Sequence, residues 1–276
     1  MWAARTRFPF AVRAGSRHEK KVESSPEPSS PFETIVAWAP FVLSAAFVAT
    51  AIELALHRRG VALVVAELSL VVFVPQLLRR RRLRRVLRSG NVDAVLDAWQ
   101  ASVERVPHPE TMAPLITATA LAAHGFSERA HRALSLARRG PAWEAALEQR
   151  LVVETLLSVF DGEPERAIQS STTLEGLPLP PSPFLRGRVA ALRSAMSAFA
   201  RAFAHRAAAR DLSTLKTAAR QNPLVHWAMR YAAAVASIDQ GKRTEAARLL
   251  AGAPEWPKES AFASFHEEIA EAASLS

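Results

Sequence analysis

Two long hydrophobic windows stand out near the start of the chain. Residues 35–52 hold no charged side chain, and residues 61–78 hold only Glu67. A helix over either window would be about 27 Å long, close to the hydrocarbon thickness of a bilayer. A short polar segment that includes Arg58 and Arg59 separates the windows. The pattern predicts a transmembrane helical hairpin over residues 34–78. A helical hairpin buried in a soluble domain is the alternative.

Arginine is concentrated directly after the second window. Positive residues that flank a membrane span stay on the cytoplasmic side and attract anionic lipid headgroups. We therefore expect a protein integral to the cytoplasmic (inner) membrane, with two spans and with both termini in the cytoplasm. The arginines expected to set this topology and to contact anionic lipid are Arg79, Arg80, Arg81, Arg82, Arg84 and Arg85.

Residues 1–33 precede the first window and are polar, with several prolines and serines. They hold too few apolar side chains to form a core, so we expect a disordered cytoplasmic tail. The tail begins with Arg5, Arg7, Arg13 and Arg17 and no acidic residue, as organellar transit peptides do, and a transit peptide is the alternative.

Charge is distributed unevenly along the chain. The formal net charge is +9 and the pI is about 11.0. Residues 89–276 nevertheless hold 20 of the 35 Lys and Arg residues and 20 of the 26 Asp and Glu residues, so they carry no net charge. Nucleic-acid binding requires a basic surface, and we do not expect it here. The chain has no cysteine, which excludes disulfides, thiolate metal sites and cysteine nucleophiles.

The region after residue 90 is rich in Ala, Leu, Arg and Glu and shows no alternating strand pattern, so it predicts an all-α domain over residues 79–276. Its first helix is expected to continue from the second hydrophobic window through residue 88. The further expected helices cover residues 92–106, 111–124, 127–138, 142–160, 164–174, 184–208, 212–220, 224–239, 243–251 and 258–273. Short turns favour antiparallel neighbours, except for the proline-rich segment 176–183, which is expected to be extended.

A repeated pattern runs through this domain. A glycine is followed five residues later by a small or branched residue and then by a proline. The sets are Gly90, Val95 and Pro107; Gly125, Ala130 and Pro141; Gly162, Ala167 and Pro178; and Gly241, Ala246 and Pro254, while Arg206 and Pro223 share the spacing without glycine. The pattern resembles the tetratricopeptide-repeat family in a degenerate form, since the family's aromatic positions are mostly absent. The resemblance implies an α-solenoid of helix pairs. A non-repetitive helical bundle is the alternative.

Motifs for catalysis are absent from the sequence: it holds no phosphate-binding loop, no GxSxG and no HExxH, and the histidines do not pair at metal-ligand spacing. We therefore expect no catalytic residue, no metal site, no cofactor and no small-molecule substrate. Glu67 is the candidate for packing against a partner helix in the membrane, with a passive protonated side chain or a proton relay as alternatives.

Four arginines recur along the helix expected at residues 184–208. Arg186, Arg188, Arg193 and Arg201 could line a groove for an acidic peptide, or could serve only to solvate the helix. Repeat arrays commonly bind other proteins. The function expected from the sequence is a membrane-tethered, non-enzymatic adaptor that presents helical repeats to a protein partner at the cytoplasmic membrane face. The alternatives are an accessory subunit of a membrane transport or secretion assembly that uses Glu67, and an enzyme without a recognisable motif.

Overall fold

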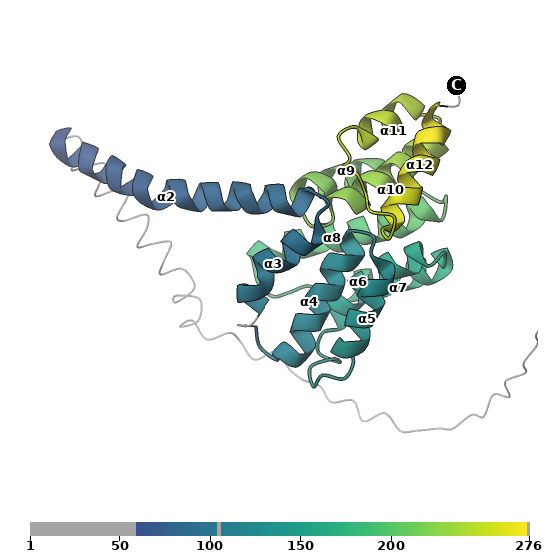
Figure 1. The fold of residues 1–276 in the computed structure, drawn as a ribbon, viewed down its shortest axis with the longest axis horizontal. Coiled ribbons are helices and arrows are strands. Elements are labelled where there is room, and N and C mark those ends of the chain that lie inside the picture. Colours follow the sequence, from purple (N-terminus) through teal and green to yellow (C-terminus); the bar gives the residue numbers. More distant parts are fainter. Residues whose placement is uncertain (1–58, 104–105, 275–276) are drawn as a thin grey trace, which may run out of the picture. The chain divides into compact units, whose positions relative to one another are not determined.

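The computed structural model describes residues 59–103 and 106–274 (Figure 1). Every regular element in these residues is a helix, which confirms the predicted all-α fold class. The chain divides into two compact units, Met1–Val72 and Phe73–Ser276. The predicted tail, the first hydrophobic window and most of the predicted turn of the hairpin lie outside the described residues.

Helix α2 spans Arg59–Arg88 without a break, so the second hydrophobic window does continue as one helix into the arginine block. No helix in the described part of the chain is long and apolar enough to cross a membrane. Glu67 and Pro75 interrupt the apolar part of α2, and arginines fill its last turns, where charge is costly in hydrocarbon. The predictions of an integral protein with two membrane spans and of localisation in the cytoplasmic membrane are therefore wrong. The lipid contact expected of the arginine block was inferred from those spans and loses that basis.

The remaining helices follow the predicted order closely. They are α3 (Val92–Val103), α4 (Pro109–Ala123), α5 (Ser127–Ala137), α6 (Leu147–Phe160), α7 (Pro164–Gly176), α8 (Pro183–Phe203), α9 (Asp211–Gln221), α10 (His226–Asp239), α11 (Arg243–Leu250) and α12 (Ala261–Ser274). Two bounds differ by five residues from the sequence prediction, and the others differ by three or fewer. Residues 141–146 form turns instead of the start of α6, and α8 ends at Phe203 instead of Ala208.

Four tight turns between helices share one hydrogen-bond pattern. Gly125, Gly162 and Gly241 have φ angles of 80°, 73° and 72°, a left-handed conformation that a Cβ atom disfavours. At each turn the next residue donates its N–H to a carbonyl five positions earlier, as Phe126 does to Leu121 at 2.9 Å. His205 takes the same role with φ 55° where the glycine is missing, one residue before the predicted position. These are Schellman-type helix ends, and each lets the next helix turn back on the last.

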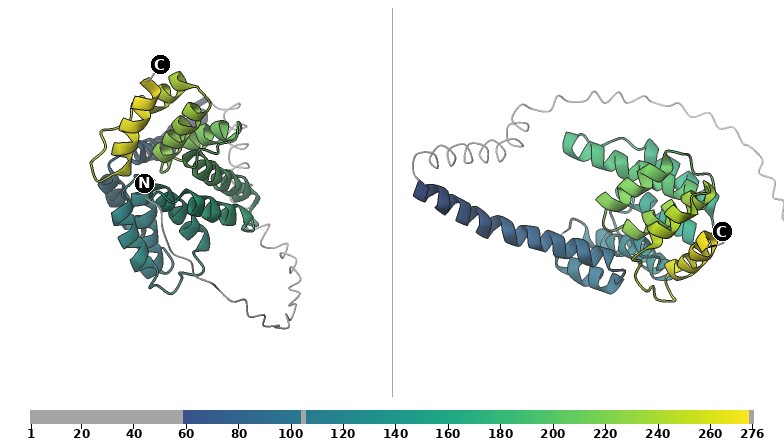
Figure 2. Two further views of the ribbon diagram at one scale, coloured as in Figure 1. Left: turned by 90° about the vertical axis from the view of Figure 1, so that its right-hand side faces the viewer. Right: turned by 90° about the horizontal axis from the view of Figure 1, so that it is seen from above.

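The helices of the unit Phe73–Ser276 pack mainly on their sequence neighbours and on the next helix but one. One series of helices consists of α4, α6, α8, α10 and α12, and each helix in it contacts the next one in the series. The helices between them, α5, α7, α9 and α11, pack against their neighbours in the sequence (Figures 1 and 2). The small residues Val95, Ala130, Ala167 and Ala246 are completely buried at the same place in α3, α5, α7 and α11. Small side chains at these points allow helix axes to approach closely.

Aromatic side chains fill the space where the C-terminal segment packs. Phe262 at the start of α12 stacks on Tyr231 of α10, with ring centroids 4.8 Å apart, and meets Phe160 of α6 edge-on at 5.5 Å. The indole N–H of Trp256 donates to the Tyr231 hydroxyl at 2.8 Å. Burial raises the pKa of Tyr231 to about 12, so the hydroxyl stays protonated at neutral pH. The C-terminal segment is thus part of the core.

Candidate functional site

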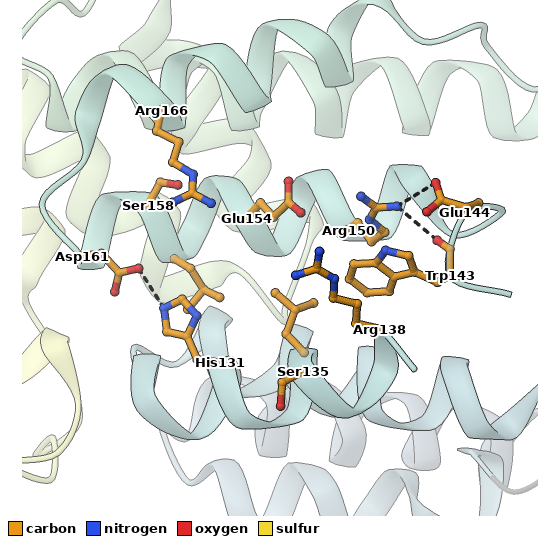
Figure 3. Close-up of a pocket in the computed structure, with 12 residues that line it drawn as sticks. His131, Ser135, Arg138, Trp143, Glu144, Arg150, Glu154, Ser158, Asp161 and Arg166 are labelled. Atoms are coloured by element: carbon orange, nitrogen blue, oxygen red, sulfur yellow. Dashed lines mark hydrogen bonds and ion pairs between the residues drawn. The ribbon is translucent and has the colours of Figure 1, made fainter. Parts of the chain in front are cut away.

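A cavity with a volume of about 730 Å³ lies between α5 and α6 (Figure 3). It falls within the range of ligand-binding pockets. Helix α5 forms one wall, α6 the other, and the connector between the two helices closes one end. The lining residues are His131, Leu134, Ser135, Arg138, Trp143, Glu144, Arg150, Glu154, Leu157, Ser158, Asp161 and Arg166.

The connector between α5 and α6 is held against the start of α4, away from the cavity. The backbone N–H of Ala142 donates to the Thr111 hydroxyl at 3.1 Å. Gly140 lies so close to Thr111 that a Cβ atom on Gly140 would come within 2.1 Å of the Thr111 Oγ1. Only glycine permits this approach, so the residue fixes the path of the connector. The connector in turn keeps the end of α5 and the start of α6 apart.

Trp143 and Arg150 close the connector end of the cavity. The Arg150 guanidinium lies over the Trp143 ring, 4.1 Å from its centroid. Its Nη1 donates to the Trp143 carbonyl at 3.4 Å and to the exposed carboxylate of Glu144 at 3.3 Å. Arg150 Nε is buried and has no hydrogen-bond partner among the described residues. A stacked, bonded guanidinium of this kind forms a rigid wall.

His131 and Asp161 close the opposite end. The imidazole Nε2 of His131 lies 2.8 Å from the carboxylate of Asp161, the residue that directly follows α6, so the pair connects α5 to the end of α6. Two serines line the same space: Ser135 donates its hydroxyl to the Arg132 carbonyl at 2.7 Å, and Ser158 is buried on α6. No serine hydroxyl in the described residues bonds to His131, so the structure gives no paired nucleophile and base at this end.

Arg138 and Glu154 lie on opposite walls of the cavity (Figure 3). Arg138 follows directly after α5 and is exposed, while Glu154 is half-buried on α6. The other charged lining side chains have partners, since Arg166 also bonds Glu163 at 2.9 Å. Among the described residues, neither Arg138 nor Glu154 has an ion pair. The cavity therefore presents one cation and one anion that no other described residue neutralises.

Two smaller cavities lie elsewhere in the same unit. One, of about 320 Å³, lies between α8 and α9 and is lined by small and hydroxyl-bearing residues, including Ser194 and Thr217. The other, of about 190 Å³, lies among α8, α10 and α12 beside the ion pair of His205 with Asp239. The charged lining residues of this second cavity are paired, except for Glu268 at its rim. Neither cavity offers unpaired charges of both signs.

The predicted arginine row does not form one surface. Arg186 and Arg188 are exposed near the start of α8. Arg193 is buried: it donates to the carbonyls of Leu177 at 2.5 Å and of Pro178 at 3.2 Å, and it pairs with Glu148. Arg193 thereby holds the proline-rich connector against α8.

Arg201, the last residue of the predicted row, also has a structural partner. It forms two hydrogen bonds of 2.8 Å to the Asp211 carboxylate. Burial acts to raise the pKa of Asp211, but the bonds from Arg201 and from the Ala208 N–H outweigh it and leave this pKa lowered. Arg201 and Asp211 thus connect α8 to the start of α9.

The other predicted site residues lie on α2. The side chain of Glu67 is outside the described set, as is that of Arg80. Arg79, Arg81, Arg82, Arg84 and Arg85 are all exposed. No group of three His, Cys, Asp or Glu side chains in the described residues could hold a metal ion.

No protein-family model, no curated protein and no solved structure matches the chain. The resemblance to tetratricopeptide repeats accordingly stays a prediction. The residues of the α5–α6 cavity were missed by sequence reasoning, which began a helix at residue 142 and so left only residues 139–141 as a connector. The signal was the run Gly140, Pro141 and Trp143, since proline and glycine mark a break and an aromatic residue follows it directly.

Proposed function

We propose that this chain is a non-enzymatic helical-repeat adaptor that binds a protein partner in the α5–α6 cavity. The observation that carries the proposal is the cavity itself, a space of about 730 Å³ lined mostly by polar and charged side chains. Leu134, Leu157 and the Trp143 ring add apolar contact area, and Arg138 and Glu154 have no ion pair among the described residues. Apolar contact area with a few placed polar groups is the usual composition of a recognition site.

The repeated architecture supports the adaptor function. Ion pairs connect successive helix pairs on the outer side: Asp93 of α3 bonds Arg129 of α5 at 2.7 Å, and Lys216 of α9 bonds Glu245 of α11. Together with the four similar turns, these pairs favour a stack of helix–turn–helix units, as the tetratricopeptide-like resemblance implies. In a solenoid each unit contacts its neighbours only, so gaps between units are natural binding sites.

The interior of the cavity suits a side chain or a short peptide. Leu134, Leu157 and the Trp143 ring supply apolar contact area. Aromatic and arginine side chains in such positions contribute much of the affinity in protein interfaces. The wall that carries Trp143 and Arg150 is rigid, which lowers the entropy lost when a partner binds.

The proposal is tested by filling the cavity. Ser135 is an exposed lining residue on α5, and Ser135→Trp places an indole in the opening without disturbing buried side chains. Leu136 is the matched control: it is exposed on the same helix and does not line the cavity, so Leu136→Trp adds the same surface elsewhere. The full-length protein and both variants are used for affinity capture from extracts of the source cells, followed by mass spectrometry.

We expect a defined protein to be recovered with the wild type and with Leu136→Trp, and to be lost with Ser135→Trp. Helix content measured by circular dichroism should be the same for all three proteins. Equal recovery with both tryptophan variants, or no protein recovered above background with any of the three, would contradict the proposal.

A further inference from the structure

We infer that the α5–α6 cavity takes a peptide segment that carries charges of both signs, with an acidic side chain on Arg138 and a basic side chain on Glu154. This inference rests on the proposed adaptor function and adds the chemistry of the partner. Arg138 and Glu154 lie on opposite walls, so one bound segment can contact both (Figure 3).

The pairing of the other charged groups leaves these two for a ligand. Arg150 is occupied by Trp143 and Glu144, and His131 by Asp161. Arg166 bonds Glu163 at the rim. If a ligand broke these pairs in order to bind, their loss would offset part of the free energy of binding. A ligand that binds Arg138 or Glu154 breaks no existing side-chain bond, because neither side chain bonds to another described residue.

The two unpaired charges also select against ligands of one sign. A purely acidic segment that reaches Arg138 brings a like charge close to Glu154, and a purely basic segment does the reverse with Arg138. Like charges in a partly desolvated space cost affinity, whereas a mixed segment satisfies both walls. Glu154 is half-buried, so its charge is screened less by solvent than that of a surface residue.

The size of the cavity favours a peptide over a free amino acid. The volume of about 730 Å³ exceeds that of a single residue several-fold, and the cavity is open to solvent. Leu134, Leu157 and Trp143 lie among the charged groups, so an apolar residue of the segment can pack between its acidic and basic residues. The expected motif is therefore acidic, apolar, basic, in one direction or the other.

The probes are fluorescein-labelled peptides that place a leucine among alanines between two end residues. The end residues are Glu and Lys, Lys and Glu, Glu and Glu, or Lys and Lys, and each set is made with one, two or three residues between the ends. Binding to the full-length protein is measured by fluorescence anisotropy. We expect the best mixed-charge peptide to bind at least about tenfold more tightly than any single-sign peptide, as for two favourable charge contacts of moderate strength.

Charge reversals give the decisive result. Arg138→Glu should shift the preference to peptides with two lysines, and Glu154→Arg should shift it to peptides with two glutamates. The double variant should again prefer mixed charge, in the opposite direction. Arg139→Glu is the control, because Arg139 is exposed next to Arg138 but does not line the cavity, and it should leave the wild-type preference unchanged. Since neither cavity residue has a bonded partner, all these variants should fold with unchanged helix content.

The outcomes separate this inference from the adaptor proposal. Equal binding of mixed and single-sign peptides, or preferences that do not invert on charge reversal, would overturn the inference even if Ser135→Trp abolishes capture of a partner. In that case the cavity binds a partner, but not through one acidic and one basic side chain of that partner. If Ser135→Trp leaves partner capture intact, the adaptor assignment fails on its own measurement.

Discussion

The hydroxyl of Ser260 donates a hydrogen bond of 2.8 Å to the backbone carbonyl of His124, 136 residues earlier in the chain. The N–H of Ala261 donates to the carbonyl of Gly125 at 2.8 Å beside it. The segment before α12 thus satisfies backbone groups at the end of α4, which a helix end otherwise leaves unpaired. The C-terminal segment therefore stabilises the α4–α5 turn, which positions one wall of the cavity.

This contact predicts that replacing Gly125 by alanine lowers the free energy of unfolding more than replacing Gly162 does. Gly125 and Gly162 both have positive φ, but a Cβ on Gly125 would come within 2.7 Å of Ser260 Oγ, while a Cβ on Gly162 meets nothing within 4 Å. Gly162→Ala should lower the free energy of unfolding by about 1–2 kcal/mol, from the backbone conformation alone. Gly125→Ala should cost about 1–3 kcal/mol more, because the C-terminal segment must shift. Urea denaturation measures both, and equal costs would show that Ser260 does not constrain the turn.

The connector predicts a comparable effect at Gly140. Its Cβ would meet Thr111, so Gly140→Ala should lower the free energy of unfolding by about 1–3 kcal/mol and should displace the wall that carries Trp143. Gly187→Ala is the control, since Gly187 is helical, lies in α8 and has open space around it. That substitution should be neutral or should stabilise the protein by up to about 1 kcal/mol. Thermal unfolding compares the two variants, and an unchanged melting temperature for Gly140→Ala contradicts the predicted contact.

Burial of His124 predicts a loss of stability in mild acid. Burial lowers the pKa of this histidine, against the opposing effect of its 2.8 Å hydrogen bond to the Ala120 carbonyl. The folded state then resists a proton that the unfolded chain accepts near pH 6.5. Stability is full above that pH and falls as the pH drops below it, toward the lowered pKa of the folded state.

The matching measurement is the free energy of unfolding between pH 5 and pH 8 for the wild type and for His124→Phe. The phenylalanine keeps an aromatic ring beside Trp256 but cannot titrate. Its curve should be flatter than that of the wild type below pH 6.5. His226, whose pKa is also lowered by burial, leaves a residual slope in both proteins. Parallel curves would exclude His124 as the source.

The ion pair of Arg201 with Asp211 predicts a larger loss of stability than the exposed arginines of α8 do. Asp211 is buried and accepts three hydrogen bonds, two from Arg201 and one from the Ala208 N–H. Asp211→Asn should lower the free energy of unfolding by about 2–3 kcal/mol, because it removes charge-assisted bonds from Arg201. Arg188→Ala, on the exposed part of α8, should change it by less than about 0.5 kcal/mol. Urea denaturation distinguishes them, and similar effects would contradict the structural role of Arg201.

Much of the helical fold is predictable from the sequence because glycine and proline mark most of its turns. Gly125, Gly162 and Gly241 each end a helix where the pattern placed the end. The turn at His205 was misplaced by one residue, because a histidine, unlike a glycine, gives no sequence signal for positive φ. The imidazole of His205 bonds the Asp239 carboxylate at 2.9 Å, but these residues are distant in the sequence, so the pattern could not show this contact either. The end of α8 was therefore drawn too late.

The candidate site could not be predicted because it depends on the distance between two helices. Sequence periodicity indicates which face of α5 or α6 is buried, but not that the connector holds them apart through Thr111. Sequence periodicity also could not show the partners of Arg193 and Arg201, which were therefore expected in a groove. The partner of Arg193, Leu177, lies in the connector before α8, and the partner of Arg201, Asp211, is the first residue of α9. The membrane prediction was wrong because it weighed the apolar residues of the second window more heavily than Glu67, Pro75 and the arginines of the same helix.

Site-specific photocrosslinking measures whether a partner protein occupies the α5–α6 cavity. Benzoylphenylalanine replaces Leu134, which lines the cavity, or Leu136, which is exposed on the same helix outside it. The account predicts that a partner protein crosslinks at position 134 at least about tenfold more than at position 136, and that Arg138→Glu removes the product at position 134. Equal crosslinking at the two positions, or a product at position 134 that Arg138→Glu leaves unchanged, would contradict the assignment of the α5–α6 cavity as the recognition site.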